Sequence, residues 1–196
     1  MAVGASTPVG PSPVTGAIRK AAQATGASFQ YLLATAKVES DLNPNLTVRT
    51  STATGLFQFI EQTWLATLKQ AGPAFGYGNY ANAISRTASG RYTVDDPGLR
   101  AEIMQLRKDP AVNALMGGVF TQQNIAALST RLGRAPSENE LYIAHFLGPS
   151  GAAKAIALAR SNPTADANES GNSPSTRSPK RLVPSSMGCC NWPASH

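Results

Sequence analysis

The sequence feature that most constrains the fold is a dense series of helix start and stop signals between residues 15 and 162. Asp96-Pro97 and Asp109-Pro110 each place a capping carboxylate before a proline. Proline is tolerated at the first helical position because its missing N–H would have no partner there anyway. After the second signal, apolar residues repeat at helical intervals over Pro110–Leu132, and a glycine follows. These start and stop signals predict an all-α, mainly helical domain.

The same kinds of signal predict five further helices, at residues 15–25, 28–42, 61–70, 137–147 and 152–160. Thr15 and Ser28 are the expected N-caps of the first two helices, and Ser137 with Glu140 has the spacing of a capping box. The Gly/Tyr/Asn segment after Gly72 is expected to be irregular. Only residues 56–60 alternate like a strand, so we expect at most a minimal β element.

The two ends of the chain differ in composition from this helical part. Residues 1–14 are rich in Pro and Gly and predict a flexible leader, whereas residues 163–196 predict a disordered Ser/Pro-rich tail. Cys189 and Cys190 lie in that tail, where they cannot cross-link the core. With 42% hydrophobic and 14% charged residues, the chain has enough apolar material for one domain with a buried core, which we place at residues 15–162.

The charge balance narrows the classes of partner. The chain carries 17 Lys and Arg against 11 Asp and Glu, a formal charge of +6, which favours contact with an anionic polymer. Basic residues are not clustered with aromatic ones, which argues against nucleic-acid binding. No apolar stretch reaches the roughly 20 residues that span a bilayer, so we expect no integral membrane segment. The N-terminus shows no secretory signal peptide.

Glu39 is the first candidate for chemistry. It lies near the end of the second predicted helix, among largely apolar neighbours. A carboxyl group that is partly buried there has a raised pKa, as a general acid near neutral pH requires. From this segment alone, Glu39 is better interpreted as a solvated surface residue, because most glutamates are exposed.

Two further segments could line a binding site. Gly55-Leu56-Phe57-Gln58-Phe59-Ile60 sets one amide among large apolar side chains, a combination that suits sugars. The alternative is a short core segment with an outward Gln58. His145 lies in the third segment, Ala144-His145-Phe146-Leu147-Gly148-Pro149, as either a core or a cleft residue. A lone histidine on an apolar helix is usually structural.

The order and spacing of these three segments resemble the three motifs of the soluble lytic transglycosylases, over about Ile18 to Ile156. The family motifs are Glu-Ser, Gly-Leu-Met-Gln and Ala-Tyr-Asn-Ala-Gly. The first two match, with Phe57 where Met is usual, and the third has His145 and Phe146 in place of Tyr and Asn. The resemblance implies a lysozyme-like helical fold. The altered third motif looks like that of variant domains associated with flagellar assembly.

The resemblance also implies the chemistry. Glu39 would act as acid and then as base, cleaving the β-1,4 bond between N-acetylmuramic acid and N-acetylglucosamine and leaving a 1,6-anhydro end, with no cofactor and no metal. Five residues are the expected substrate contacts: Ser40, Gln58, Phe57, His145 and Tyr142. The implied partners are peptidoglycan glycan strands and flagellar or other envelope-spanning machinery, in the periplasm or cell envelope.

Two alternatives compete with this function. A lysozyme-type muramidase of related fold would use water instead of the C6 hydroxyl, and only the transglycosylase would leave anhydro ends. A non-catalytic peptidoglycan-binding or flagellar scaffold module would keep the fold without the chemistry. Glu39 argues against the scaffold, and the altered third motif favours it.

Overall fold

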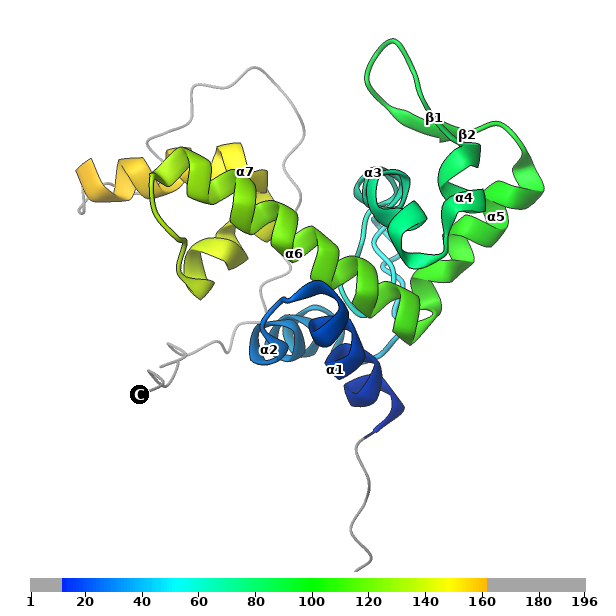
Figure 1. Cartoon of the computed structure of the whole chain (residues 1–196), viewed down its shortest axis with the longest axis horizontal. Coiled ribbons are helices and arrows are strands. Elements are labelled where there is room, and N and C mark those ends of the chain that lie inside the picture. Colours follow the sequence, from blue (N-terminus) through cyan, green and yellow to red (C-terminus); the bar gives the residue numbers. More distant parts are fainter. Residues whose placement is uncertain (1–11, 162–196) are drawn as a thin grey trace, which may run out of the picture.

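The computed structural model describes residues 12–161, which form a mainly helical domain (Figure 1). The helices are α1 (Pro13–Thr25), α2 (Phe29–Ser40), α3 (Glu61–Ala71), α4 (Gly78–Ala83), α5 (Pro97–Gln105), α6 (Pro110–Leu132) and α7 (Glu138–Ser161). Two 3-10 turns, η1 (Gly72–Phe75) and η2 (Leu106–Lys108), follow α3 and α5. Strands β1 (Ile84–Arg86) and β2 (Tyr92–Val94) pair antiparallel, Ile84 opposite Val94. The predicted fold class is confirmed.

Helix α6 is the central element, with α1, α2, α3 and α7 packed around it (Figure 1). Two adjacent glycines on α6 permit the closest approaches. A Cβ on Gly118 would lie 2.4 Å from Oγ1 of Thr25 in α1, and one on Gly117 would lie 2.8 Å from the ring of Phe57. Any larger side chain at these two positions would therefore push α1 and the segment before α3 away from the central helix.

The hydrophobic core has two parts. In the larger part, fully buried Trp64 of α3 packs edge-on against Phe59, with ring centroids 5.4 Å apart, and its indole N–H donates to the carbonyl of Ile103. The smaller part joins the far end of α6 to α7 through Leu128, Ala144, Ala152 and Ile156. The second half of α7 is thus attached through its own small apolar cluster.

Most predicted helix boundaries are confirmed. Ser28, Asp96 and Asp109 accept hydrogen bonds from the first backbone N–H groups of α2, α5 and α6. Ser137 and Glu140 form the reciprocal bonds of a capping box at the start of α7. Gly148 has non-helical φ and ψ of 67° and 165°, so α7 is broken before Pro149, as predicted.

Two predicted boundaries were wrong. Helix α1 begins at Pro13, and its N-cap is Ser12 rather than Thr15, because Ser12-Pro13 repeats the signal of a capping side chain before proline. Helix α2 ends at Ser40 instead of continuing to Asn43-Pro44. Asp41 and Leu42 both have positive φ, 54° and 61°, so the chain leaves the helix in a left-handed turn.

The predicted β element was misplaced. Residues 56–60 form no strand, and this region has only isolated bridges that join Thr54 to Thr47 and Phe59. The strands lie instead within the segment predicted to be irregular, which also holds α4. Each strand is three residues long, too short for an alternating pattern to stand out, and Gly90 with a φ of 83° permits the turn between them.

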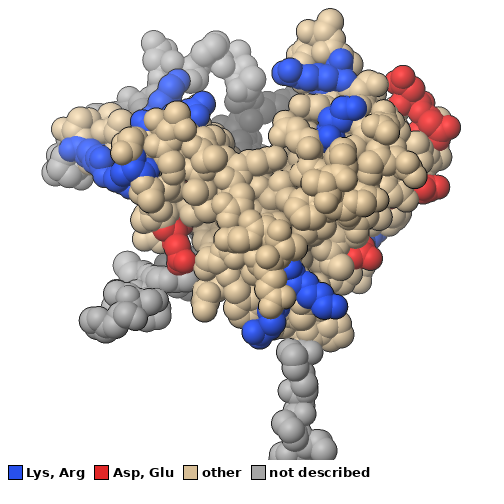
Figure 2. All heavy atoms as spheres, viewed as in Figure 1, with Lys and Arg blue, Asp and Glu red and all other residues tan. Residues whose placement is uncertain are grey.

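No helix within residues 12–161 is long and apolar enough to cross a membrane. Figure 2 shows one face of the molecule, on which Lys and Arg lie over the outer ends of the helices and near the hairpin, around a broad uncharged middle. Most of the predicted leader (residues 1–11) and the predicted tail (163–196), with Cys189 and Cys190, lie outside the described residues.

Candidate active site

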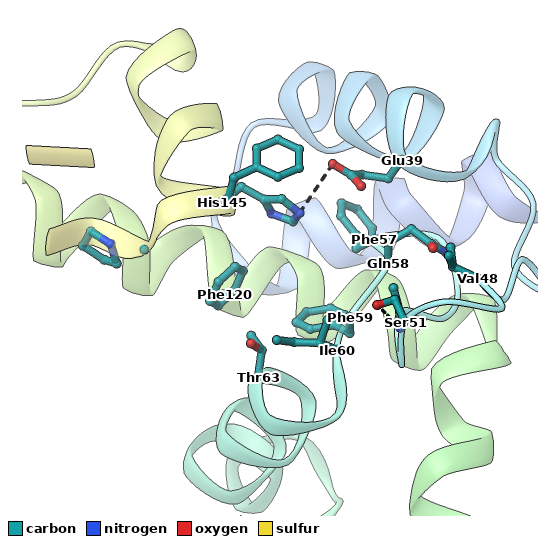
Figure 3. A pocket seen from close by; sticks show the side chains of 14 residues that line it. Glu39, Val48, Ser51, Phe57, Gln58, Phe59, Ile60, Thr63, Phe120 and His145 are labelled. Atoms are coloured by element: carbon teal, nitrogen blue, oxygen red, sulfur yellow. Dashed lines mark hydrogen bonds and ion pairs between the residues drawn. The ribbon is translucent and has the colours of Figure 1, made fainter. Parts of the chain in front are cut away.

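A pocket of about 600 Å³ opens between the end of α2, the segment that precedes α3, and helices α6 and α7 (Figure 3). Its lining brings together residues far apart in the sequence, including Glu39, Phe57, Gln58, Phe120 and His145. The left-handed turn after Ser40 ends α2 one residue beyond Glu39, and the segment that follows contributes Val48, Ser51 and Ala53 to the lining.

Glu39 lies in the last turn of α2 with its side chain only 11% exposed. Burial raises its pKa to about 7, so the carboxyl group is partly protonated near neutral pH. Its Oε1 atom is fully buried and is left without a hydrogen-bond partner among residues 12–161. The structure therefore shows a desolvated carboxyl group in a pocket and not a solvated surface glutamate.

His145 of α7 faces Glu39, with its Nε2 atom 3.6 Å from Oε1 (Figure 3). Burial lowers the pKa of His145 to about 4, so the imidazole is neutral at pH 7. The contact is therefore between a carboxyl group and a neutral imidazole, and not an ion pair. A neutral imidazole can either donate or accept at Nε2, depending on its tautomer.

The segment before α3 presents Gln58 and Phe57 from one tight turn. Gln58 has a φ of 45°, and its side-chain NH2 donates to the carbonyls of Gly55 (2.7 Å) and Leu46 (3.2 Å). Its amide oxygen is the end left for a ligand. Phe57 is 2% exposed and packs its ring against α6, forming the inner wall of the pocket.

Ser40 and Tyr142 are not among the residues that line the pocket. Ser40 is buried, with Oγ 3.0 Å from the carbonyls of both Ala36 and Leu56, so it joins the end of α2 to the next segment. Tyr142 lies parallel to the ring of His145, with centroids 6.5 Å apart. Of the five predicted substrate contacts, the structure thus brings Phe57, Gln58 and His145 together with Glu39.

A comparison with known families identifies the domain. Residues 16–167 match the model of the transglycosylase SLT domain, which covers more than half of the chain. The chain belongs to this family. Membership indicates lytic transglycosylase-type processing of peptidoglycan and a lysozyme-like, mainly helical fold.

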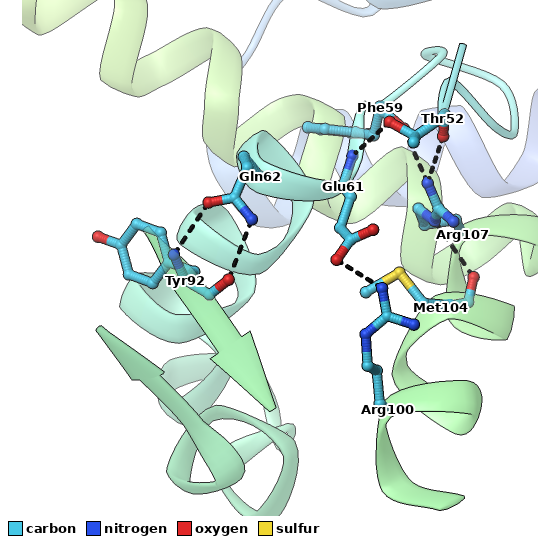
Figure 4. A network of polar contacts seen from close by, with 8 residues as sticks. All are labelled: Thr52, Phe59, Glu61, Gln62, Tyr92, Arg100, Met104 and Arg107. Atoms are coloured by element: carbon cyan, nitrogen blue, oxygen red, sulfur yellow. Dashed lines mark hydrogen bonds and ion pairs between the residues drawn. The ribbon is translucent and has the colours of Figure 1, made fainter. Parts of the chain in front are cut away.

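Within this SLT domain, two buried polar residues that the sequence analysis missed, Arg107 and Asn113, hold the segment before α3 in place. Figure 4 shows the contacts of Arg107. Nη1 of Arg107 donates to the carbonyls of Thr52 (2.6 Å) and Phe59 (3.2 Å). Asn113 of α6, fully buried, accepts from the N–H of Phe57 at 3.1 Å and donates to the carbonyl of Arg107 at 2.7 Å. We refer to Arg107 and Asn113 as the polar clamp.

The polar clamp also explains the glycine of the second motif. Gly55 has a φ of 85°, and a Cβ there would lie 2.0 Å from the carbonyl oxygen of Arg107. Only glycine fits at this point. In the sequence, Asn113 was detectable as an amide on an otherwise apolar helix face, whereas Arg107 resembles an ordinary surface arginine.

The SLT domain has a second hollow of about 350 Å³, between α3, the hairpin and α6. Thr63 and Phe120 line both hollows, so the two are neighbours along one surface. Gln62 fixes the hairpin at this place, because its side-chain amide both donates to and accepts from the backbone of Tyr92 (Figure 4). The second hollow lengthens the surface that an extended ligand could contact.

Proposed function

We propose that this SLT domain cleaves the β-1,4 bond between N-acetylmuramic acid and N-acetylglucosamine and closes a 1,6-anhydro ring, with Glu39 as acid and then base. One observation carries the proposal: Glu39 places a desolvated carboxyl group, with a pKa of about 7, in the wall of the main pocket. A pKa close to the working pH lets one group both give and take a proton.

Glu39 alone can carry out both proton transfers of this reaction. Protonated Glu39 gives its proton to the glycosidic oxygen, and the bond to C1 of the muramic sugar breaks. The N-acetyl group of the substrate stabilises the positive charge that develops at C1. The Glu39 carboxylate then takes the proton of the C6 hydroxyl while O6 bonds to C1, which closes the ring. Glu39 ends protonated, and no water is consumed.

The composition of the pocket favours this route over a lysozyme-type muramidase. Most glycosidases use two carboxyl groups, about 5 Å or about 6.5 to 9.5 Å apart. Among the described residues that line the pocket, Glu39 carries the one carboxyl group. The nearby Asp41 is exposed and pairs with Lys37 on the outer side of α2. A second carboxylate for activating water is thus missing from the described lining.

The extended surface supports a polymeric substrate. Two neighbouring hollows that share Thr63 and Phe120 can contact several sugars of one glycan strand. Phe146 is 58% exposed at the pocket and can stack on a sugar ring, although it cannot replace the hydrogen bonds of an amide. Phe146 stands where the third family motif has Asn, and this difference is the observation that favours a non-catalytic scaffold.

The proposed setting is the cell envelope, with glycan strands as the substrate. The formal charge of +6 suits an anionic cell wall. Flagellar or other envelope-spanning machinery is the proposed protein partner, supported by the form of the third motif alone. Copurification of the full chain with such an assembly from envelope fractions would test that partner separately from the chemistry.

Mass spectrometry of muropeptides released from purified sacculi tests the proposed reaction. We expect 1,6-anhydro ends with the full chain and none with Glu39→Gln. Reducing ends that incorporate ¹⁸O from labelled water would identify a muramidase instead. Retention on sacculi with no released product would identify a binding module. The inactive variant must still bind sacculi for its loss of products to be assigned to chemistry.

A further inference from the structure

The buried oxygen of Glu39 gives His145 a role other than sugar binding. Oε1 has less than 1 Å² of accessible surface and no hydrogen-bond partner within residues 12–161, and Nε2 of His145 lies 3.6 Å away. A buried carboxyl oxygen without a partner is costly, and the structure offers a donor beside it. The distance exceeds a normal hydrogen bond, but catalytic hydrogen bonds are often long before a ligand fills the site.

Three aromatic rings hold the imidazole in this orientation. Phe120 of α6 and Phe146 of α7 meet it edge-on, with centroids 5.8 and 5.3 Å away, while Tyr142 lies parallel to it. In Figure 3, His145 projects between Phe120 and Glu39. The side chain of His145 is only 14% exposed, so most of its surface is taken up by these neighbours and by Glu39. A ring packed in this way has little freedom to turn towards a sugar.

We propose that His145 is a positioning residue, whose Nε2–H donates to Oε1 of Glu39 and leaves Oε2 as the oxygen that exchanges a proton with the substrate. This inference rests on the function proposed above. With the other tautomer, Nε2 would accept the carboxyl proton and draw it away from the glycosidic oxygen. A donor at Nε2 has the opposite effect, because it satisfies the inner oxygen in both protonation states of Glu39.

The other titratable groups around Glu39 do not compete for this role. Tyr31 of α2 and Tyr142 of α7 both interact with Glu39, and burial raises the pKa of each to about 12, so both keep a neutral hydroxyl. Neither hydroxyl donates to Oε1 of Glu39, which has no hydrogen-bond partner within residues 12–161. The negative charge of Glu138 of α7 contributes to the raised pKa of Tyr31. On α2 itself, Lys37 and Asp41 pair with each other at the surface. The neutral imidazole is therefore the group placed to stabilise the carboxylate that forms in mid-reaction.

Direct titration of Glu39 tests the inference. Glutamate labelled with ¹³C at the carboxyl carbon gives one NMR signal per residue, and the signal lost in Glu39→Gln identifies Glu39. The informative pair is His145→Gln, which keeps an N–H donor, and His145→Met, which has similar bulk and no donor. We expect His145→Met to raise the pKa of Glu39 by about one unit or more, because a hydrogen bond to a charged group is lost. His145→Gln should stay within a few tenths of a unit of the wild type.

Activity on sacculi supplies a second readout. His145→Met should lower kcat by about tenfold or more and move the alkaline limb of the kcat/KM profile to higher pH, whereas His145→Gln should restore most of both. Tyr142→Phe, which keeps the ring and removes a neutral hydroxyl, is the matched control and should leave the pKa of Glu39 unchanged. If His145→Met does not fold, His145→Phe provides the donor-free comparison.

Two outcomes would overturn the inference. An unchanged pKa of Glu39 in the donor-free variant would leave His145 a packing residue only. A lowered pKa would show that Nε2 accepts the carboxyl proton, which is the opposite tautomer. The NMR titration needs no turnover, so a chain that releases no anhydro products would contradict the proposed function while still reporting on the contact between His145 and Glu39.

Discussion

At the scale of single residues, the candidate chemistry depends on how Glu39 is desolvated. The carboxyl group lies at the end of α2, against His145 on one side and the pocket on the other, and burial is the cause of its raised pKa. The same burial keeps His145 neutral at pH 7. Both groups are therefore uncharged at slightly acidic pH, which lowers the desolvation cost of placing them in contact.

Replacing Glu39 by Gln tests its catalytic role. The amide keeps the shape of the side chain but cannot deliver a proton, so we expect cleavage of sacculi to fall by about 10² to 10⁴. Product release measured by mass spectrometry checks this. Activity within about tenfold of the wild type, in a folded variant, would remove Glu39 from the role of acid.

The same substitution predicts a pH-dependent gain in stability. Burial raises the pKa of Glu39 from 4.5 to about 7, so its stabilising contribution is present below pH 4.5 and is lost as the pH rises through 7. At pH 9 the wild type buries a carboxylate and Glu39→Gln does not. The variant should then be more stable by on the order of 3 kcal/mol.

Thermal unfolding at pH 4 and pH 9 measures this difference. A higher Tm for Glu39→Gln at pH 9, with nearly equal Tm values at pH 4, is the expected pattern. The pKa of His145 is lowered to about 4, so its stabilising contribution is lost as the pH falls through 4, but both proteins share that change. Equal Tm values at pH 9 would show that the folded-state pKa of Glu39 is not raised.

At the scale of structural elements, the pocket depends on the segment between α2 and α3. This segment has isolated bridges in place of a sheet ladder, so its backbone groups need side-chain partners. The polar clamp supplies them, since Arg107 and Asn113 together bind the carbonyls of Thr52 and Phe59 and the N–H of Phe57. The backbone around Gln58 is thus held by side chains of η2 and α6, and the bonds to Gly55 and Leu46 then orient its amide.

Asn113→Ala tests the polar clamp. The change leaves the N–H of Phe57 and the carbonyl of Arg107 without their partner in the interior, so we expect a loss of about 2 to 4 kcal/mol. At about 2 to 4 °C per kcal/mol, the Tm should fall well outside experimental error. Thr130→Ala on the same helix is the control, because its hydroxyl is exposed and bonds only within α6. Equal Tm values for the two variants would contradict the role of Asn113.

At the scale of the whole molecule, α6 joins two unequal apolar clusters. The larger contains residues from Ile18 to Leu141, and the smaller holds the second half of α7 through Leu128, Ala152 and their neighbours. Phe120 of α6 and His145 of α7 both line the pocket and meet edge-on, with ring centroids 5.8 Å apart. Every residue of both clusters lies between residues 14 and 156.

A chain that ends after residue 167 should therefore keep both its Tm and its cleavage activity. It retains both apolar clusters and the whole of the family match, residues 16–167. Thermal unfolding and sacculus digestion of the shortened and full chains measure this directly. A drop in Tm of more than a few degrees would show that residues 168–196 contribute to the folded domain.

Local signals determined most helix boundaries. Capping side chains before proline and left-handed glycines act within four or five residues, so the starts of α5 and α6 and the break at Gly148 were predictable from the sequence. The order of three motifs also made Glu39 a candidate, and the structure places it in the pocket. Thr15 was the wrong cap because Ser12-Pro13 carries the same signal three residues earlier.

The tertiary structure alone decided which side chains share the pocket. Ser40 follows Glu39 directly, yet helix phase turns it away from the pocket and towards the carbonyl of Leu56. Tyr142 lies one turn before His145 on the same helix face and packs parallel to its ring, yet it does not line the pocket. The polar clamp and the short hairpin depend on contacts between distant segments, such as Arg107 with Thr52 and Gln62 with Tyr92. A local pattern cannot encode such contacts, because burial and hydrogen-bond partners arise only when the helices pack.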